Sequence, residues 1–460
     1  MTRWIAWTFL RSAGWPRAAL LAGTTAVATA LVLVALTMLL LPSQPVEALF
    51  SLVAEPGLRW GTAFATTLLV LPLLLMLNQV VRLGTAKRER RLAALRLAGA
   101  TPAEVRRIGA IEVGLPVTLG ALTGPLVFVL LREVFGGTGI HPGYGGGALT
   151  QTLALIPRSV TPSWWQMVAV VAVVAAAGVA TGSLASRHLV ASPLGVSRRV
   201  GRPAPRPWGL LLVGTGLAAV AVAASGVFGR GQAAVMAGIL LVVLGVVALG
   251  PWVAFRSGQR AARRTSDPAT LIAAGHLVSD PRPAGRAAAA VGAIGIASGA
   301  TAVMEVGVFF YSNSSFIDPF FVISFALVGA ALILVLLVTA STLAVHAAES
   351  LVDRRRVLAA LVAAGTPVSV LRDALRREAM LTAMPLSVGG VLIGAVVAGA
   401  VGVASADSTG TPMVNLAGLL VVSGQVALTV GLTCAAIRIA IGAVAPRLVQ
   451  ASAPANLRTE

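Results

Sequence analysis

The sequence predicts an all-α, polytopic membrane protein with about ten transmembrane helices. Of its 460 residues, 57% are apolar and 11% are charged, and the mean hydropathy is +0.90. A soluble chain of this length does not have such a composition. The apolar residues form long segments, and the basic residues gather between them. Together these observations favour a chain that crosses a bilayer many times.

Ten apolar segments are long enough to cross the ~30 Å hydrocarbon layer of a bilayer. No small-residue cleavage pattern follows the first segment, so we expect a retained span and not a signal peptide. The predicted spans are residues 18–41, 61–83, 108–131, 165–184, 209–228, 233–255, 287–310, 320–343, 379–403 and 416–439.

The basic residues predict how the chain is oriented in a cell membrane. With the N-terminus inside, 31 of the 35 basic residues fall in inside segments, and the four outside are Arg59, Arg132, Arg158 and Arg230. The positive-inside rule then places both termini in the cytoplasm. In a soluble protein the net charge of +19 would suggest a nucleic acid partner. Here we expect none, because loops of this kind face anionic lipid and a soluble partner.

One basic stretch occurs twice. Lys87–Glu112 and Asp353–Glu378 match at 10 of 26 positions without a gap, at an offset of 266 residues (378 − 112 = 266). Self-similarity of this kind predicts an internal duplication. An even number of predicted spans separates the copies, so both face the cytoplasm and the repeats are parallel.

Each copy has the pattern of a short helix, a sharp bend and a new helix. Gly99 and Gly365 stand where a residue in the left-handed conformation would end the first helix. Thr101 and Glu104 then have the spacing of a capping box, whereas the second copy has Ser369 in place of the glutamate. The new helix leads directly into an apolar span.

The expected organisation has three parts. Residues 1–208 form a first four-span unit with its basic helix at 87–100, and residues 286–460 form a second with its basic helix at 353–366. Between them, residues 209–285 form a two-span insert and a cytoplasmic linker. The external loops are too short for a folded domain of ordinary size.

The repeated stretch resembles the FtsX-like permease domain. Its features are a charged run, then L-A-A-L-R-L-A-G-A-T, and a glutamate thirteen residues after the glycine in both copies. Such domains occur in membrane subunits of mechanotransmission ABC transporters, including MacB and the bacitracin-type ten-span permeases. The resemblance implies a permease subunit, not an enzyme. A separate ABC ATPase, two copies per permease, would carry ATP and magnesium, and this chain would hold no cofactor. Unlike those relatives, this chain has no large external domain.

The resemblance also implies roles for individual residues. The basic helices would be coupling helices that dock on the ATPase, each ended by its glycine, Gly99 or Gly365. Apolar anchors would be Leu92, Leu95, Leu358 and Leu361, and partners for acidic groups of the ATPase would be Arg88, Arg90, Arg354 and Arg356. Glu112 and Glu378 would hold the bend. Their arginine partners are expected on other segments, because Arg106 and Arg372 lie six residues back, off the i+3/i+4 face. Alternatively, the basic helices only lie on anionic lipid.

Few other residues carry a chemical signal. Glu305 is the one acid well inside a span and is a candidate for gating or substrate contact. We expect Gln425 to form an inter-helix hydrogen bond and His346 to be solvated at a helix end. No nucleotide-binding loop, catalytic constellation or metal-ligand cluster is apparent.

Three functions are therefore weighed. The leading expectation is a permease that couples ATP hydrolysis on its partner to export or extraction of a lipophilic or peptide-like substrate. The alternatives are a signalling or regulatory FtsX-like protein that transports nothing, and an ion-coupled secondary transporter. The last would need titratable groups near the midplane of the bilayer, and the spans offer almost none.

Overall fold

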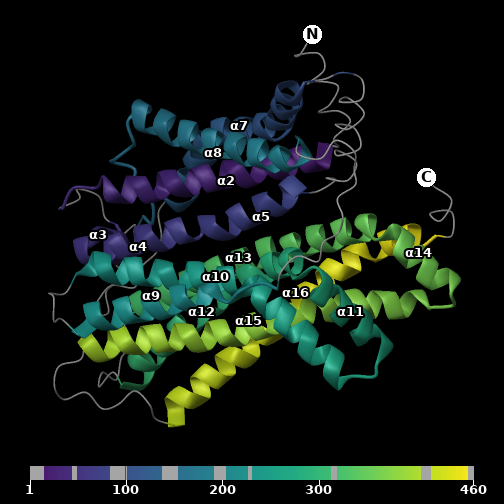
Figure 1. Ribbon diagram of the computed structural model, residues 1–460. Helices are drawn as coiled ribbons and strands as arrows, with labels where there is room; N and C mark the ends of the chain where they lie inside the picture. Colours follow the sequence, from purple (N-terminus) through teal and green to yellow (C-terminus); the bar gives the residue numbers. More distant parts are fainter. Residues whose placement is uncertain are drawn as a thin grey trace. The chain divides into compact units, whose positions relative to one another are not determined.

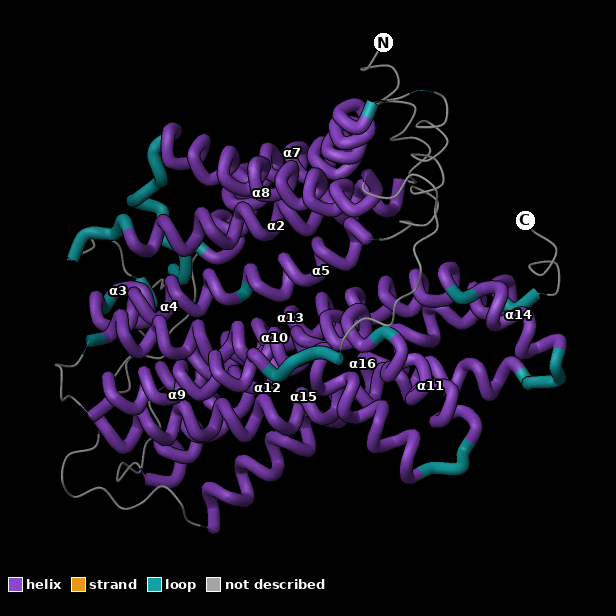
Figure 2. The backbone as a smooth tube through the Cα atoms, viewed as in Figure 1, coloured by secondary structure: helices purple, strands orange, loops and turns teal. Residues whose placement is uncertain are grey.

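The computed structural model describes residues 15–43, 49–82, 99, 101–136, 154–190, 204–225, 231–311, 319–405 and 416–453. These residues are helical apart from short connections and one isolated bridge between Leu49 and Ala154, as Figures 1 and 2 show. The chain divides into two compact units, Met1–Val200 and Gly201–Glu460. The predicted fold class, an all-α polytopic membrane protein, is confirmed.

Nine helices among the described residues are long and apolar enough to cross a membrane. The fourth predicted span, residues 165–184, coincides with a 27-residue helix, Trp164–Val190. Within it only Trp164–Ala180 is recognised as an apolar helix, which is shorter than a span. This fourth span, like the orientation of the termini, stays a prediction.

Unit 1 is built around its first helix. The helices of this unit are α2 (Trp15–Leu39), α3 (Ser51–Ala54), α4 (Pro56–Leu68), α5 (Val70–Arg82), α7 (Pro102–Phe135) and α8 (Trp164–Val190). Helix α2 contacts α4, α5, α7 and α8, and Figure 1 shows it running alongside α7 and α8. The approach to α7 is close, because a Cβ atom added at Gly124 would lie 2.5 Å from Cβ of Thr29. Small residues let two membrane helices pack backbone to backbone in this way.

The second predicted span is two helices in the structure, with a break at Leu69 between α4 and α5. Pro72 accounts for the break. It has no N–H to donate to the carbonyl of Leu68, and its ring crowds that carbonyl.

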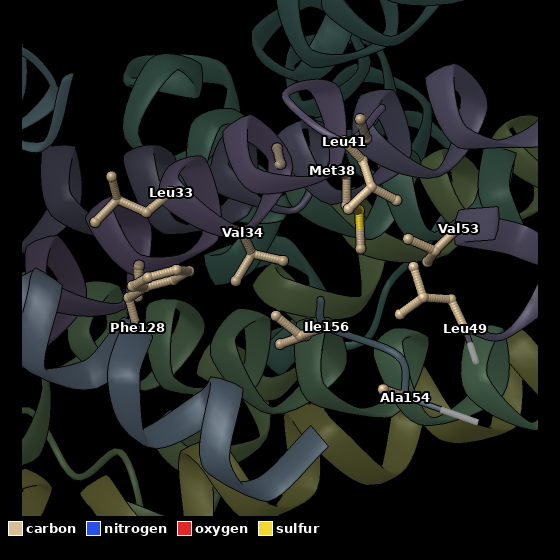
Figure 3. Packing of buried hydrophobic residues seen from close by; sticks show 12 residues of the cluster. Leu33, Val34, Met38, Leu41, Leu49, Val53, Phe128, Ala154 and Ile156 are labelled. Carbon is tan, nitrogen blue, oxygen red and sulfur yellow. The ribbon is translucent and has the colours of Figure 1, made fainter. Parts of the chain in front are cut away.

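A cluster of apolar side chains lies at one end of unit 1. Side chains from α2, α3, α7 and the segment around Ile156 converge there, as Figure 3 shows. Arg59 is 5% exposed and donates to the carbonyls of Val53, Ala54, Leu41 and Pro42 at 2.7–3.1 Å. These bonds tie α4 to α3 and to the residues that directly follow α2.

Unit 2 contains the insert and the second repeat. Its helices are α9 (Trp208–Ser225), α10 (Gln232–Arg264), α11 (Pro268–Ser279), α12 (Pro281–Tyr311), α13 (Pro319–Asp353), α14 (Arg355–Ala363), α15 (Val368–Ser405) and α16 (Leu416–Ala451). Helices α9 and α10 pack through glycines, since a Cβ at Gly245 would lie 2.7 Å from the backbone nitrogen of Val213. Helix α10 in turn packs on α12, so the predicted insert is part of this compact unit.

The duplication extends to the packing of the helices. Helix α12 and α15 approach closely where a Cβ at Gly390 would lie 3.1 Å from Cα of Gly295. This contact corresponds to Gly124 and Thr29 in unit 1, because both residues are shifted by the same offset (390 − 124 = 266; 295 − 29 = 266). The same crossing point therefore joins α2 to α7 and α12 to α15.

Candidate force-transfer sites at the two helix bends

Two glycines mark the bends of the duplicated stretch. Gly99 has φ +95° and Gly365 has φ +92°, and they are the residues with positive φ in the described part of the chain. An L-residue pays roughly 1–2 kcal/mol in this conformation, which glycine adopts freely. The prediction of a left-handed residue at each bend is confirmed.

The hydrogen bonds explain why a helix ends at Gly365 and why a helix begins after Gly99. After Gly365, the Thr366 N–H donates to the Leu361 carbonyl and the Gly365 N–H donates to the Val362 carbonyl, both at 2.9 Å. This pair of bonds is the Schellman motif that ends a helix. After Gly99, the Thr101 hydroxyl accepts from the Glu104 N–H, and the Glu104 carboxylate accepts from the Thr101 N–H at 2.8 Å. That N–H bond is the main cause of a lowered pKa for Glu104, and the predicted capping box is confirmed.

The carboxylate of Glu112 is buried on α7, thirteen residues after Gly99. Arg17 of α2 donates to it at 2.7 Å, and the side chains of Arg17 and Glu112 are 11% and 5% exposed. The same guanidinium donates to the carbonyls of Val80 at 3.2 Å and Val81 at 2.9 Å, at the end of α5. One arginine thus ties the base of α7 to two other helices.

Glu378 occupies the equivalent place in unit 2 and is 6% exposed. Its carboxylate lies 3.2 Å from Nη1 of Arg354 and 3.3 Å from Nδ1 of His276. Arg354 and His276 also contact each other at 2.7 Å. A guanidinium can only donate, so Arg354 supplies a donor to the Glu378 carboxylate, and Nδ1 of His276 lies between the two charged groups.

These contacts place each glutamate's partner on another element, as the spacing predicted. The partners nevertheless differ between the repeats. Position 283, the counterpart of Arg17, is Pro283, and unit 2 uses an arginine next to its short basic helix together with a histidine of α11. Figure 1 shows α11 and α14 at the same end of unit 2.

On α14, the structure buries part of the surface that was expected to dock on the ATPase. Leu358 is 5% exposed and packs with Leu351, Leu371 and Leu448, and Leu361 packs against the same cluster. Leu358 is therefore turned away from any partner. Because Arg354 is engaged with Glu378, it too faces inward. The exposed side chains of α14 include Arg356 and Val357, and Val357 is 55% exposed.

The corresponding residues of the first copy lie outside the described residues. These are Arg88, Arg90, Leu92 and Leu95.

The remaining predicted residues are distributed over unit 2. Gln425 of α16 donates to the Ser298 hydroxyl of α12 at 2.7 Å, which confirms the expected inter-helix hydrogen bond. Glu305 is half-buried on α12, away from Glu378, and the described residues offer it no ion pair. The expectation of a solvated His346 is wrong, because its side chain is partly buried and lines a small cavity together with Glu378. Sequence reasoning missed this site, since the histidines of α11 and α13 are far apart in the chain.

Among the described residues, no group of three His, Cys, Asp or Glu side chains could hold a metal ion. The fold and these sites define a multi-pass α-helical membrane protein in which a buried glutamate follows each left-handed glycine and is ion-paired to another element.

A comparison with protein families identifies part of the chain. Residues 62–194 match the family model described as FtsX-like permease C-terminal. The match covers less than a third of the chain and includes both Gly99 and Glu112. The match suggests a membrane permease of the ABC-transporter type, and members of this family usually work with an ABC ATPase. No curated protein and no solved structure matches the chain.

Proposed function

We propose that this chain is the membrane subunit of a mechanotransmission ABC transporter. A separately encoded ATPase, bound in two copies, would supply the energy for export or extraction of a lipophilic or peptide-like substrate. One observation carries the proposal. In both repeats a left-handed glycine is followed, thirteen residues later, by a buried carboxylate that is bonded to other helices.

This arrangement suits the transfer of force from the basic segment before each bend to the span after it. These two segments, residues 87–100 in the first repeat and α14 in the second, are called the first and second lever below. The glycine permits the bend, and the capping and Schellman hydrogen bonds fix its angle. The buried glutamate prevents the new helix from moving alone, because its charge has to stay with its partner. A displacement of the lever in unit 1 would therefore reach α2 and α5 as well as α7.

The docking surface on the second lever is best assigned to the exposed face of α14. Arg356 and Val357 lie on this face, and a basic residue beside an apolar one suits an acidic-rimmed groove. The offset of 266 assigns Arg90 and Arg91 to the same role in the first lever.

The test uses the chain purified from its native membranes together with the proteins bound to it. We compare the wild type with a variant carrying Arg90→Glu, Arg91→Glu, Arg356→Glu and Val357→Asp. The proposal expects an ATP-hydrolysing protein with the wild type and its loss from the variant, while the variant remains in the membrane. Val449→Asp is the control, because Val449 is 58% exposed near the end of α16 and lies on neither lever. Retention of the ATPase by the lever variant, or its equal loss from the control, contradicts the proposal.

A further inference from the structure

A groove with a basic end and an apolar end lies between α10 and α15 in unit 2. Its volume is about 670 Å³, and it is lined by both helices and by the start of α11. Clefts that hold small ligands span ~300–1,000 Å³. The groove belongs neither to the two levers nor to the Glu378 site.

The basic end is a row of arginines on one helix face. Arg256, Arg260 and Arg264 line the groove, and their four-residue spacing places them one above the other on α10. All three are exposed, and among the described residues none of them forms an ion pair, while the Arg256 guanidinium lies 5.8 Å from the centroid of the Trp252 ring. A fourth arginine, Arg377 of α15, is already paired with Asp267 at 2.6 Å. The row therefore holds three positive charges that lack a described counter-charge.

The apolar end comes from the next turns of both helices. Met380, Leu381, Met384 and Pro385 of α15 line it, opposite Trp252 and Val253 of α10. On α10 the arginines follow Trp252 in the chain, whereas on α15 the apolar residues follow Arg377. The two helices therefore run in opposite directions along the groove, and each has its basic residues at the same end. Both apolar stretches lie inside helices long and apolar enough to cross a membrane, at the ends of the predicted spans 233–255 and 379–403. The groove thus runs from a basic mouth toward the predicted membrane-spanning parts of both helices.

We propose that this groove binds an anionic phospholipid, with its phosphate on the arginine row and an acyl chain along the apolar end. Guanidinium groups bind phosphate oxygens through paired hydrogen bonds, and three of them line the basic end of the groove. A soluble anion would leave the apolar end unfilled, and an acidic peptide could not follow the groove into the bilayer without burying unsatisfied backbone groups. A lipid satisfies both ends.

Such a lipid would connect the insert to the helix that carries Glu378. Helix α10 belongs to the predicted insert and α15 follows the second lever. Bound between them, the lipid would resist their separation. The proposed site needs no ATPase, so its test is independent of the proposed function.

The test measures lipid binding to the purified full-length chain in detergent by native mass spectrometry. The probes are phosphatidylglycerol and the zwitterionic phosphatidylcholine, with glycerol phosphate as a competitor. We expect one phosphatidylglycerol to bind in preference to phosphatidylcholine, and glycerol phosphate not to displace it. Near a membrane surface each arginine contributes about 1 kcal/mol. Arg256→Gln with Arg260→Gln should therefore weaken binding by roughly 30-fold.

Two further variants separate the proposal from general charge effects. Arg447→Gln removes an exposed arginine of α16 that does not line the groove, and it should leave binding unchanged. Met384→Gln alters only the apolar end and should weaken phosphatidylglycerol binding while all the arginines remain. Equal binding of both lipids, displacement by glycerol phosphate, an equal loss with Arg447→Gln, no loss with Met384→Gln or the absence of any bound lipid overturns the proposal.

Discussion

The ion pair between Arg17 and Glu112 gives the most demanding test of these ideas, because its burial predicts a large effect. Replacing Arg17 by Met leaves the Glu112 carboxylate, 5% exposed, without this partner, and also removes the donor to two carbonyls at the end of α5. Breaking a buried pair in this way costs about 3–5 kcal/mol. Glu112→Gln should cost less, about 2 kcal/mol, because Arg17 keeps its carbonyl acceptors.

The double variant Arg17→Met with Glu112→Leu distinguishes a lost pair from general damage. With neither charge left in the interior, the free energy of unfolding should return to within about 2 kcal/mol of the wild type. The measurement is unfolding of the purified chain in mixed detergent micelles, followed by the far-UV circular dichroism of its helices. If force passes through this pair, the double variant should still show a lowered ATPase rate in the complex, although its stability is largely restored.

An exposed pair in the same unit supplies the control. Arg158 and Glu133 are 2.8 Å apart, close to the 2.7 Å of Arg17 and Glu112, but their side chains are 42% and 64% exposed. Exposed pairs contribute about 0–1 kcal/mol, so Glu133→Gln should change the unfolding free energy by no more than that. Equal effects of Glu133→Gln and Arg17→Met, or a double variant less stable than either single one, would refute the reasoning.

Three other variants test the bends, the packing and the linker. Gly365→Ala should lower the free energy of unfolding by about 1–2 kcal/mol, because an L-residue is strained at φ +92°. The control is Gly275→Ala in α11, where an added Cβ meets nothing within 4 Å, and it should raise the free energy of unfolding by up to about 1 kcal/mol. A Gly365→Ala variant more stable than the Gly275→Ala variant would contradict the prediction. Gly390→Val should prevent α12 and α15 from packing, because its Cβ overlaps the Gly292 carbonyl. The control is Gly389→Val, whose Cβ meets nothing within 4 Å. Limited proteolysis compares the two variants, and equal resistance to the protease would count against the close approach. The N–H of Thr270 donates to Asp267 and lowers its pKa, so Asp267 stabilises the folded chain above its unfolded pKa of about 3.9 and this contribution is lost as the pH falls through the lower folded pKa. Asp267→Asn should abolish that part of the pH dependence of the unfolding free energy. Unfolding is measured between pH 5 and pH 2, and an unchanged pH profile would contradict the prediction.

The sequence predicts the features that depend on local chemistry. The apolar segments become helices, and the glycines of both bends adopt the left-handed conformation because no other residue does so without strain. The spacing of Glu112 and Glu378 also excludes a partner on the same helix face. All of these follow from periodicities and conformational preferences that a single segment carries.

What the sequence does not predict are the contacts between distant segments. Nothing near Glu378 in the chain indicates that His276, 102 residues away, approaches its carboxylate. The burial of Leu358 depends on α13, α15 and α16 together, and an amphipathic pattern does not tell which neighbour covers its apolar face. The groove between α10 and α15 was likewise present in the sequence only as a row of arginines at four-residue spacing.

The two repeats secure their levers in different ways, and this difference bears on how they act together. In unit 1 the glutamate is tied by an arginine of α2, a helix outside the lever. In unit 2 the arginine directly precedes the helix of the lever, so displacement of α14 pulls on the partner of Glu378 itself. Helix α11 also contacts this pair, through His276. A push on the second lever would therefore strain its ion pair directly, whereas a push on the first would act through the bend and leave the pair of Arg17 and Glu112 intact. If two ATPase copies bind these levers as proposed, they would meet unequal resistance from the two repeats.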